Sequence, residues 1–150
     1  MRFEFRHFAF LGQNSTIAAR AAECAAQQDL FWEFHDRLFE VHGVESFGSV
    51  NNKRIAEEIG VDKVTFDRCL DQARVQSYVD SDFELGETMG VGSTPFFFIN
   101  GRPVIGLADF AVYEQMIEEE LGNVARIVID DSSGSAEGGC SPEEAAADCE

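Results

Sequence analysis

Four cysteines are the residues of this sequence with the greatest capacity for redox or nucleophilic chemistry: Cys24, Cys69, Cys140 and Cys149. A cysteine reacts as its thiolate, which is favoured at a helix N-terminus or beside basic groups. None of the four stands at a predicted helix start with basic neighbours, and no two are separated by only two residues. The four thiols therefore lack the setting of a reactive pair, and their spacing is not that of a zinc site.

A second stretch whose residues could take part in chemistry or binding is Gly90–Gly106, GVGSTPFFFINGRPVIG. Its apolar run Phe96–Ile99 is bounded by turn residues, which predicts a strand buried on both faces. Asn100-Gly101 suits a tight hairpin turn because both positions tolerate a positive φ, and Val104-Ile105 returns as the partner strand. Thr94-Pro95 stands at the head of the first strand. There a proline costs no interior ladder bond and leaves the preceding backbone groups available to an incoming chain.

Hydrophobic periodicity predicts one further strand and a series of helices that would position these residues. Met1–Phe10 alternates apolar and charged residues as a strand does, which makes His7 a strand residue. Helices are predicted over about 14–28, 30–41, 51–59, 62–73 and 74–89, and from Asp109 onward. The predicted caps are Asn14 or Ser15, Asn51 or Asn52, Asp62, and Asp109. The last helix is expected to pack inward through Phe110, Tyr113, Ile117 and Leu121.

Composition bounds the possible functions. The 150 residues include 14 Phe and are 45% apolar, which suits one globular domain with a sizeable core. The net charge of -17 argues against nucleic acid or an anionic membrane surface as partners. No apolar run reaches the roughly 18 residues of a membrane span, and no signal peptide is visible. No phosphate loop, nucleophile elbow or metal-ligand spacing occurs, so no cofactor or metal is expected.

The end of the chain changes in composition after Arg126. From Asp130 to Glu150 it contains glycine, serine, alanine and acidic residues with no basic residue. This predicts a domain over 1–126 and an acidic, flexible tail over 127–150, with Val128-Ile129 as a last strand-like contact. Within the tail, Cys140 and Cys149 could pair with each other, pair between chains, act as a redox relay or stay unpaired.

The proline stretch resembles the cis-proline loop and hairpin of the thioredoxin superfamily, in the form typical of bacterial DsbA-like disulfide oxidoreductases. Further stretches follow the DsbA-like pattern in order: Phe5–Phe8, Ala21–Ala25, Phe31–Phe39 and Phe66–Leu70. The resemblance covers roughly Phe3 to Leu121. It implies an α/β thioredoxin-like fold with a helical insertion over about 14–89. His35 is expected to have a scaffold role because it lies inside an aromatic helix with no Asp-Ser or Cys partner nearby in sequence.

The resemblance also implies roles for particular residues. In the family the proline is cis and faces the redox cysteines, so Ser93, Thr94 and Pro95 would form the substrate-binding surface. Cys24 and Cys69 lie on apolar helix faces, so the residues alone also allow both to be buried free thiols. The family favours a structural disulfide between them. It would close a loop of about 45 residues, contribute roughly 3–4 kcal/mol and indicate an oxidising compartment.

One departure from the family is large: its first strand and its Cys-x-x-Cys helix have no counterpart here, so the fold is expected to be N-terminally truncated. In the family that strand lies centrally, between the strands that correspond to Met1–Phe8 and Phe96–Asn100. Its loss would leave unpaired backbone edges. The simplest explanation is that Met1 is an internal position of a longer protein. The alternatives are an inactive truncated relative, or one that borrows its missing strand from another chain.

The function implied by the resemblance is thiol-disulfide exchange, with this chain as the C-terminal part of the enzyme and without the catalytic Cys-x-x-Cys. Its partners would be reduced or misoxidised substrate proteins and a redox partner protein, in an extracytoplasmic compartment. The alternative is a non-catalytic thioredoxin-fold module that binds peptides. A glutathione-using relative with a catalytic serine is disfavoured, because neither Ser15 nor Ser93 occupies the lost redox position.

Overall fold

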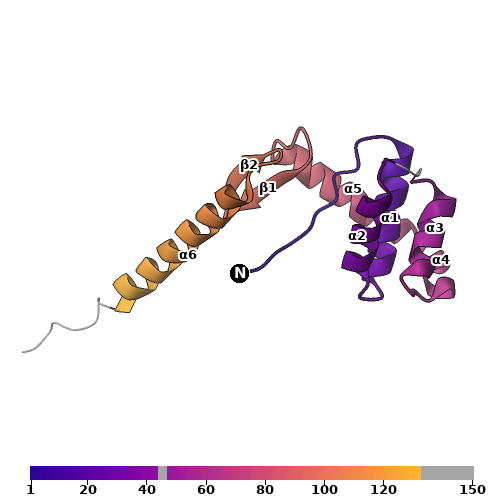
Figure 1. The fold of residues 1–150 in the computed structure, drawn as a ribbon, viewed down its shortest axis with the longest axis horizontal. Coiled ribbons are helices and arrows are strands. Elements are labelled where there is room, and N and C mark those ends of the chain that lie inside the picture. The colour runs from indigo at the N-terminus through magenta and orange to yellow at the C-terminus, as the bar shows by residue number, and fades with distance from the viewer. Residues whose placement is uncertain (44–46, 133–150) are drawn as a thin grey trace, which may run out of the picture. The chain divides into compact units, whose positions relative to one another are not determined.

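Helices make up most of the chain in the computed structural model, which describes residues 1–43 and 47–132 (Figure 1). Two units are separated after Gly92, and each is described by itself. The first unit contains α1 (Gln13–Ala26), α2 (Phe31–Val41), α3 (Ser49–Glu58), α4 (Lys63–Leu70) and α5 (Ala73–Thr88). The second contains β1 (Phe96–Ile99), β2 (Arg102–Ile105) and α6 (Phe110–Ser132).

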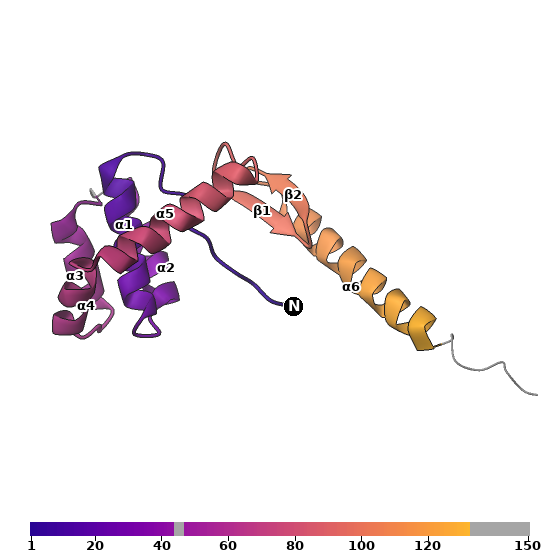
Figure 2. The same cartoon turned by 180° about the vertical axis from the view of Figure 1, so that it is seen from behind.

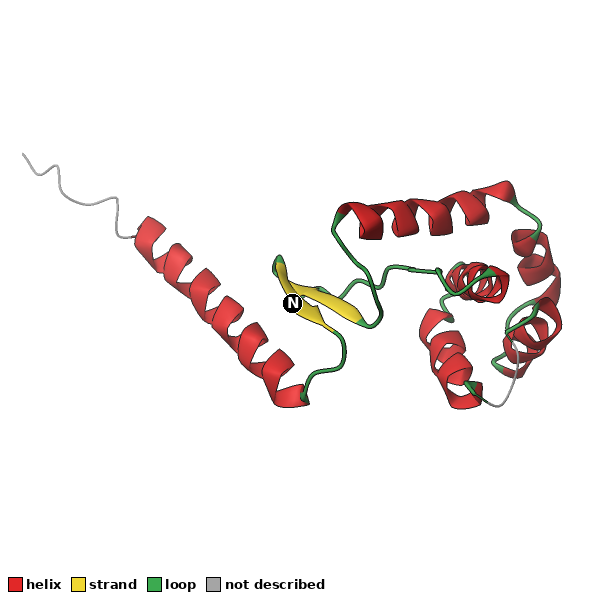
Figure 3. Cartoon of the chain, turned by 90° about the horizontal axis from the view of Figure 1, so that it is seen from above, coloured by secondary structure: helices red, strands yellow, loops and turns green. Residues whose placement is uncertain are grey.

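The core of the first unit surrounds α1, which packs against α2, α3, α4 and α5 (Figures 2 and 3). The small residues Ala21, Cys24 and Ala25 of α1 are fully buried and allow the neighbouring helices to approach closely. Large side chains fill the space between the helices: Phe34 from α2, Ile55 from α3, Phe66 from α4 and Val79 from α5. The helical periodicity of the sequence therefore predicted the presence of the helices of this unit.

The helix ends show which predicted caps are correct. Asp62 caps α4 as predicted, because its carboxylate accepts a hydrogen bond from the Thr65 backbone amide at 2.8 Å. The helix predicted over about 51–59 is present as α3, but its predicted start was wrong, since the helix begins at Ser49 and not at Asn51 or Asn52. The Asn52 side chain is buried and donates to the Phe47 carbonyl at 2.6 Å. It therefore stabilises the turn before the helix. In α1, the N-cap position belongs to Gly12.

Acid is expected to weaken the start of α4. The hydrogen bonds from Thr65 hold the pKa of Asp62 below its usual value. A carboxylate with a depressed pKa stabilises the fold above its unfolded-state pKa, and this contribution is lost as the pH falls through the folded-state pKa. Amide exchange of Thr65, followed by NMR from neutral to acidic pH, should accelerate at the low end. Asp62→Asn keeps a capping side chain without the charge, so its Thr65 exchange should lack this local acid dependence.

The N-terminal segment corrects a prediction, because Met1–Phe10 forms no strand in the structure. Within the described residues, the only strands are β1 and β2, and they pair with each other. The middle of the segment is instead attached to helix α5. The His7 amide donates to the buried Asp82 carboxylate at 3.0 Å, and the Arg6 guanidinium donates to the same group at 2.9 Å. The Phe8 ring stacks on Phe83 with centroids 4.9 Å apart.

Removing the Asp82 carboxylate should release this segment. Asp82→Ala is expected to lower the free energy of unfolding by about 2 kcal/mol, the scale of a lost hydrogen bond to a charged group plus an unsatisfied amide. The measurement is urea unfolding, with amide exchange at His7 as the local readout. The control is Asp80→Ala on the same helix, an exposed carboxylate whose recorded hydrogen bond is to the Gln76 side chain. That variant should change stability by less than about 0.5 kcal/mol.

The second unit is built on the predicted hairpin. β1 and β2 are antiparallel in the register Phe96↔Ile105 to Ile99↔Arg102. Asn100 and Gly101 form the turn with φ of 50° and 86°, as predicted. β1 is not buried on both faces, because its hairpin receives cover from α6 on one side: the Phe97 ring meets Tyr113 with centroids 5.0 Å apart. Phe98, on the opposite face from Phe97, is 38% exposed.

Helix α6 is anchored to the hairpin through its first half. Tyr113 and Ile117 are half-buried as predicted, whereas Phe110 and Leu121 are exposed, so the prediction for these two was wrong. For Leu121, in the middle of α6, the reason is length. A helix of 23 residues is about 34 Å long, and a strand of four residues covers only about 13 Å.

The C-terminal predictions are tested only in part. Val128-Ile129 lies within helix α6 rather than forming a strand-like contact, and the helix extends beyond Arg126. The rest of the predicted tail, with Cys140 and Cys149, lies outside the described residues. Among the helices that the structure describes, none combines the length and apolar character needed to cross a bilayer.

Candidate functional site

The loop before β1 contains the candidate substrate-binding residues. The Thr94–Pro95 peptide bond is cis. The Pro95 carbonyl accepts a hydrogen bond from the Gly106 amide at 2.9 Å, which fixes the proline to the end of β2. Pro95 is half-buried, whereas Ser93 and Thr94 are exposed. Within the described part of the chain, neither Ser93 nor Thr94 makes a recorded hydrogen bond, so their polar groups are available to an extended guest chain.

Contacts at the turn end of the hairpin attach it to α6. Arg102 at the start of β2 binds Glu119 of α6 at 2.9 Å and Glu120 at 3.3 Å. The Asn100 side chain donates to Glu120 at 2.7 Å. These hydrogen bonds hold the pKa of both carboxyl groups below the usual value. The charged groups of this region therefore position the hairpin and are not themselves a reaction centre.

The structure joins Cys24 of α1 to Cys69 of α4 by a disulfide, with the two Cα atoms 5.7 Å apart. Cys24 is 0% exposed and Cys69 is 2% exposed. Exchange requires a thiolate to reach a disulfide sulfur, and these sulfurs are covered by core side chains. The bridge therefore belongs to the scaffold. The described residues contain no second pair of thiols that could carry an exchange reaction.

The histidines are engaged in structural contacts. His7 is buried, and its Nε2 lies 2.8 Å from the Glu23 carboxylate on α1. His35 packs among aromatic rings, with the Phe39 ring centroid at 4.7 Å, and its Nδ1 lies 2.9 Å from Asp36. No group of three potential metal ligands was found in the part of the chain that the structure describes.

Sequence reasoning missed the buried Asp82 and its partners Arg6 and His7. These residues are separated by 75 or more positions, so no local spacing connects them. The only signal in the sequence was an acidic residue in a helix next to the apolar position Phe83. Such a residue is usually exposed, so this signal alone would have pointed the wrong way.

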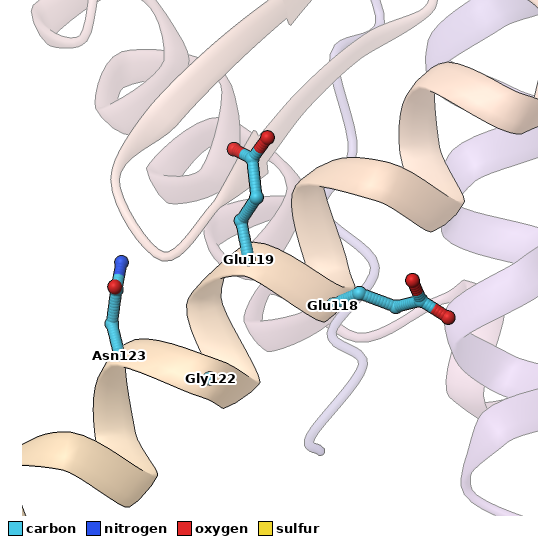
Figure 4. A pocket seen from close by; sticks show the side chains of 4 residues that line it. All are labelled: Glu118, Glu119, Gly122 and Asn123. Atoms are coloured by element: carbon cyan, nitrogen blue, oxygen red, sulfur yellow. The ribbon is translucent and has the colours of Figure 1, made fainter.

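An open hollow of about 360 Å³ lies on α6 and is lined by Glu118, Glu119, Gly122 and Asn123. Figure 4 shows Glu119 and Asn123 extending to one side of the helix while Glu118 points away. All four residues come from one helix, and none is a nucleophile. The hollow therefore brings together no groups from different elements and supports no reaction.

The comparison with known families decides the classification. The sequence model of a family described as thioredoxin matches residues 1–119. The chain belongs to the thioredoxin family. The predicted DsbA-like resemblance is confirmed by a 28% identity over 133 residues to "Disulfide bond formation protein D" of Bacillus subtilis, which covers 81% of this chain and 57% of that relative.

Solved structures agree with this classification. A thioredoxin-like oxidoreductase from Silicibacter pomeroyi matches with a TM-score of 0.69 and 26% identity, over 78% of this chain and 66% of that one. The thiol-disulfide exchange protein alpha-DsbA2 from Wolbachia pipientis matches with the same TM-score at 24% identity, over 77% and 63%. The predicted α/β thioredoxin-like fold is thereby confirmed.

The chain spans only part of the length of these relatives. It spans a little more than half of the Bacillus protein. It is also 32% identical over 119 residues to a Na(+)/H(+) antiporter NhaA of Herminiimonas arsenicoxydans, where those residues make up 79% of this chain and only 18% of the antiporter. Sequence similar to this chain therefore also occurs as a small part of a much longer protein.

Proposed function

We propose that this chain forms the substrate-binding and helical part of a DsbA-like thiol-disulfide oxidoreductase whose Cys-x-x-Cys lies outside these 150 residues. The observation that carries the proposal is the exposed pair Ser93 and Thr94, which makes no hydrogen bond within the described residues and directly precedes the half-buried Pro95 at the head of β1. The match to a disulfide bond formation protein, of which this chain spans 57%, supports it. So does the segment Met1–Phe10, which alternates as a strand yet joins no sheet in the described residues.

In the proposed reaction, Ser93, Thr94 and Pro95 bind the backbone of a reduced substrate protein. A substrate thiolate attacks one sulfur of the oxidised Cys-x-x-Cys, which forms a mixed disulfide and frees the other enzyme sulfur as a thiolate. A second substrate thiolate then attacks the substrate sulfur of the mixed disulfide. The substrate gains a disulfide, and the enzyme pair accepts two electrons. A redox partner protein would reoxidise it.

The proposed location is extracytoplasmic. Support comes from the buried disulfide between Cys24 and Cys69, because stable disulfides persist in oxidising compartments and are rare in the cytosol. Substrate proteins in such a compartment arrive reduced and unfolded. An exposed loop that pairs with extended backbone suits them.

A second candidate is a non-catalytic peptide-binding module. The observation that favours it is that the only cysteine pair in the described residues is a buried disulfide. In that case the loop would bind peptides while turnover stays at background. Both candidates predict that the loop binds peptides. They differ on the turnover of the complete protein, which should oxidise dithiols in the first case and stay at background in the second.

Replacing Pro95 should weaken peptide binding in both cases. Pro95→Ala is expected to raise the Kd of a fluorescein-labelled, unfolded peptide about tenfold, equivalent to about 1.4 kcal/mol. The reason is that the proline ring restricts the backbone at this half-buried position, and alanine would give Ser93 and Thr94 beside it more freedom to leave the binding conformation. Fluorescence anisotropy gives the Kd. The matched control is Pro103→Ala, an exposed proline in β2 of the same hairpin, which should leave the Kd unchanged.

The experiment that separates the candidates starts from the in-frame DNA upstream of the Met1 codon. The enzyme proposal expects a strand followed by Cys-x-x-Cys there, and expects the extended protein to oxidise a dithiol peptide. Replacement of the first of these cysteines by serine should abolish that activity. An in-frame stop immediately before Met1 would overturn the enzyme proposal and leave the binding module.

A further inference from the structure

The hydroxyl group of Tyr113 connects helix α6 to the backbone of the loop that follows β2. It donates a hydrogen bond to the Gly106 carbonyl at 3.3 Å and accepts one from the Ala108 amide, also at 3.3 Å. The Tyr113 ring meets the Phe97 ring of β1 edge to face, with centroids 5.0 Å apart. The ring therefore fixes the direction of the side chain, and the hydroxyl holds the two backbone groups that flank Leu107.

Side-chain packing contributes little to the position of the loop after β2. Leu107 is 89% exposed, and Asp109 is exposed as well. Within the described residues, the recorded hydrogen bonds of residues 106–108 are the two with the Tyr113 hydroxyl and one from the Gly106 amide. Because exposed side chains hold a loop weakly, the conformation of this loop depends on these three bonds.

Gly106 connects this loop to the proposed substrate-binding loop, residues 92–95. Its amide donates to the Pro95 carbonyl at 2.9 Å, while its own carbonyl accepts from Tyr113. Within the described part of the chain, the bond to Pro95 is the only recorded hydrogen bond of residues 92–95. The proline ring restricts the backbone between that carbonyl and the preceding residues, so the position of the carbonyl also affects Ser93 and Thr94.

We propose that Tyr113 is a positioning residue of the substrate-binding loop and acts on it through Gly106 and Pro95. The hydroxyl holds the loop after β2 where the Gly106 amide meets the Pro95 carbonyl. The substrate-binding loop then has fewer conformations to lose when a peptide binds, which lowers the Kd. This inference rests on the proposed function, and it adds to that function a residue of α6 that does not itself contact the peptide.

A purely structural role of Tyr113 would need only its ring. The contact with Phe97 is made by the ring, and a phenylalanine would make the same contact without a polar atom to satisfy. The hydroxyl has both of its recorded partners in the loop after β2. Tyr113→Phe therefore separates the two roles, because it removes the hydroxyl and keeps the ring.

Tyr113→Phe in the full chain should raise the Kd of the fluorescein-labelled, unfolded peptide about fivefold, the scale of one lost neutral hydrogen bond. Amide exchange followed by NMR gives the local readout. The Gly106 amide should exchange faster than in the parent, whereas amides at the turn end of the hairpin should not. The matched control is Tyr78→Phe, the same chemical change at an exposed position of α5, which should leave the Kd and the Gly106 exchange unchanged.

A double variant shows whether Tyr113 acts through Pro95. Without the proline ring, the position of the carbonyl no longer restricts the residues before it. Pro95→Ala/Tyr113→Phe should therefore have the Kd of Pro95→Ala alone, about tenfold above the parent. Independent effects would multiply to about fiftyfold, and that result would overturn the proposal.

Two further outcomes would overturn the role of Tyr113 and leave the proposed function intact. One is a parent that binds the peptide and a Tyr113→Phe variant that binds it equally well. The other is a Gly106 amide that exchanges at the same rate in both proteins. A parent chain that binds no peptide would overturn the proposed function itself, and the role of Tyr113 with it.

Discussion

Replacing both Cys24 and Cys69 with alanine is expected to lower the free energy of unfolding by roughly 3–4 kcal/mol. The bridge links positions separated by 45 residues, so its removal restores the freedom of a long loop to the unfolded chain. Both side chains are also in the core, where alanine leaves a small cavity. Urea unfolding of the oxidised parent and of the double variant measures the difference. Since many domains are stable by only about 5–15 kcal/mol, this loss is a large share of the total.

The control for this prediction is the pair Cys140→Ser and Cys149→Ser, which removes the other two thiols and keeps the bridge. It should leave the urea midpoint unchanged. If the alanine variant does not fold, the parent can be compared in urea with and without a reductant. Equal midpoints in the oxidised and reduced parent would show that the bridge contributes nothing to stability.

Truncation of Phe34 is expected to have an effect of similar size. Phe34→Ala should lower the free energy of unfolding by about 3–5 kcal/mol, the usual range for a buried phenylalanine. The ring is 0% exposed and lies 6.3 Å from the Phe66 ring, so its loss opens a cavity between α2 and α4. The measurement is again urea unfolding, with an unchanged m-value as the sign that the denatured state is unaffected.

The same helix offers a matched control. Phe39→Ala removes an equal number of atoms from a position that is 69% exposed, and should change the free energy of unfolding by less than about 0.5 kcal/mol. A Phe34→Ala variant as stable as Phe39→Ala would contradict the packing described for this core. A large loss for Phe39→Ala would show that its exposed face is covered in solution.

Local patterns predicted the helices because burial repeats along each helix. Phe34 and Val41 of α2, and Val75 and Val79 of α5, recur at helical spacing and are buried. The hairpin was predictable for a different reason, since Asn100 and Gly101 tolerate the positive φ that both adopt. These elements depend on neighbours in sequence, so the sequence is sufficient to predict them.

Contacts distant in sequence could not be predicted in this way. The residues of Met1–Phe10 alternate as those of a strand do, but the structure has no strand there, because a strand exists only when another strand pairs with it. The burial of Asp82 in helix α5 could not be predicted for the same reason. Its burial depends on Arg6 and His7, which no periodicity connects to it.

The candidate site was predicted from family resemblance more than from residue chemistry. Thr94-Pro95 alone is weak evidence for a cis bond, since X-Pro bonds in folded proteins are cis only about 5% of the time. The surrounding sequence supplied the expectation, and the structure has that bond in the cis form. The substrate-binding role of Ser93, Thr94 and Pro95 stays a prediction until the Pro95 experiment is done.

The disulfide also determines how the protein responds to a cut in its chain. Cys24 and Cys69 enclose α2 and α3 completely, together with the segments of chain on either side of them. A protease that cleaves once anywhere between the two cysteines produces two fragments that remain one covalent molecule. Such a nicked protein would migrate as intact on a non-reducing gel and as two bands after reduction. The bridge thus gives the helical unit a covalent continuity that the peptide backbone alone does not provide.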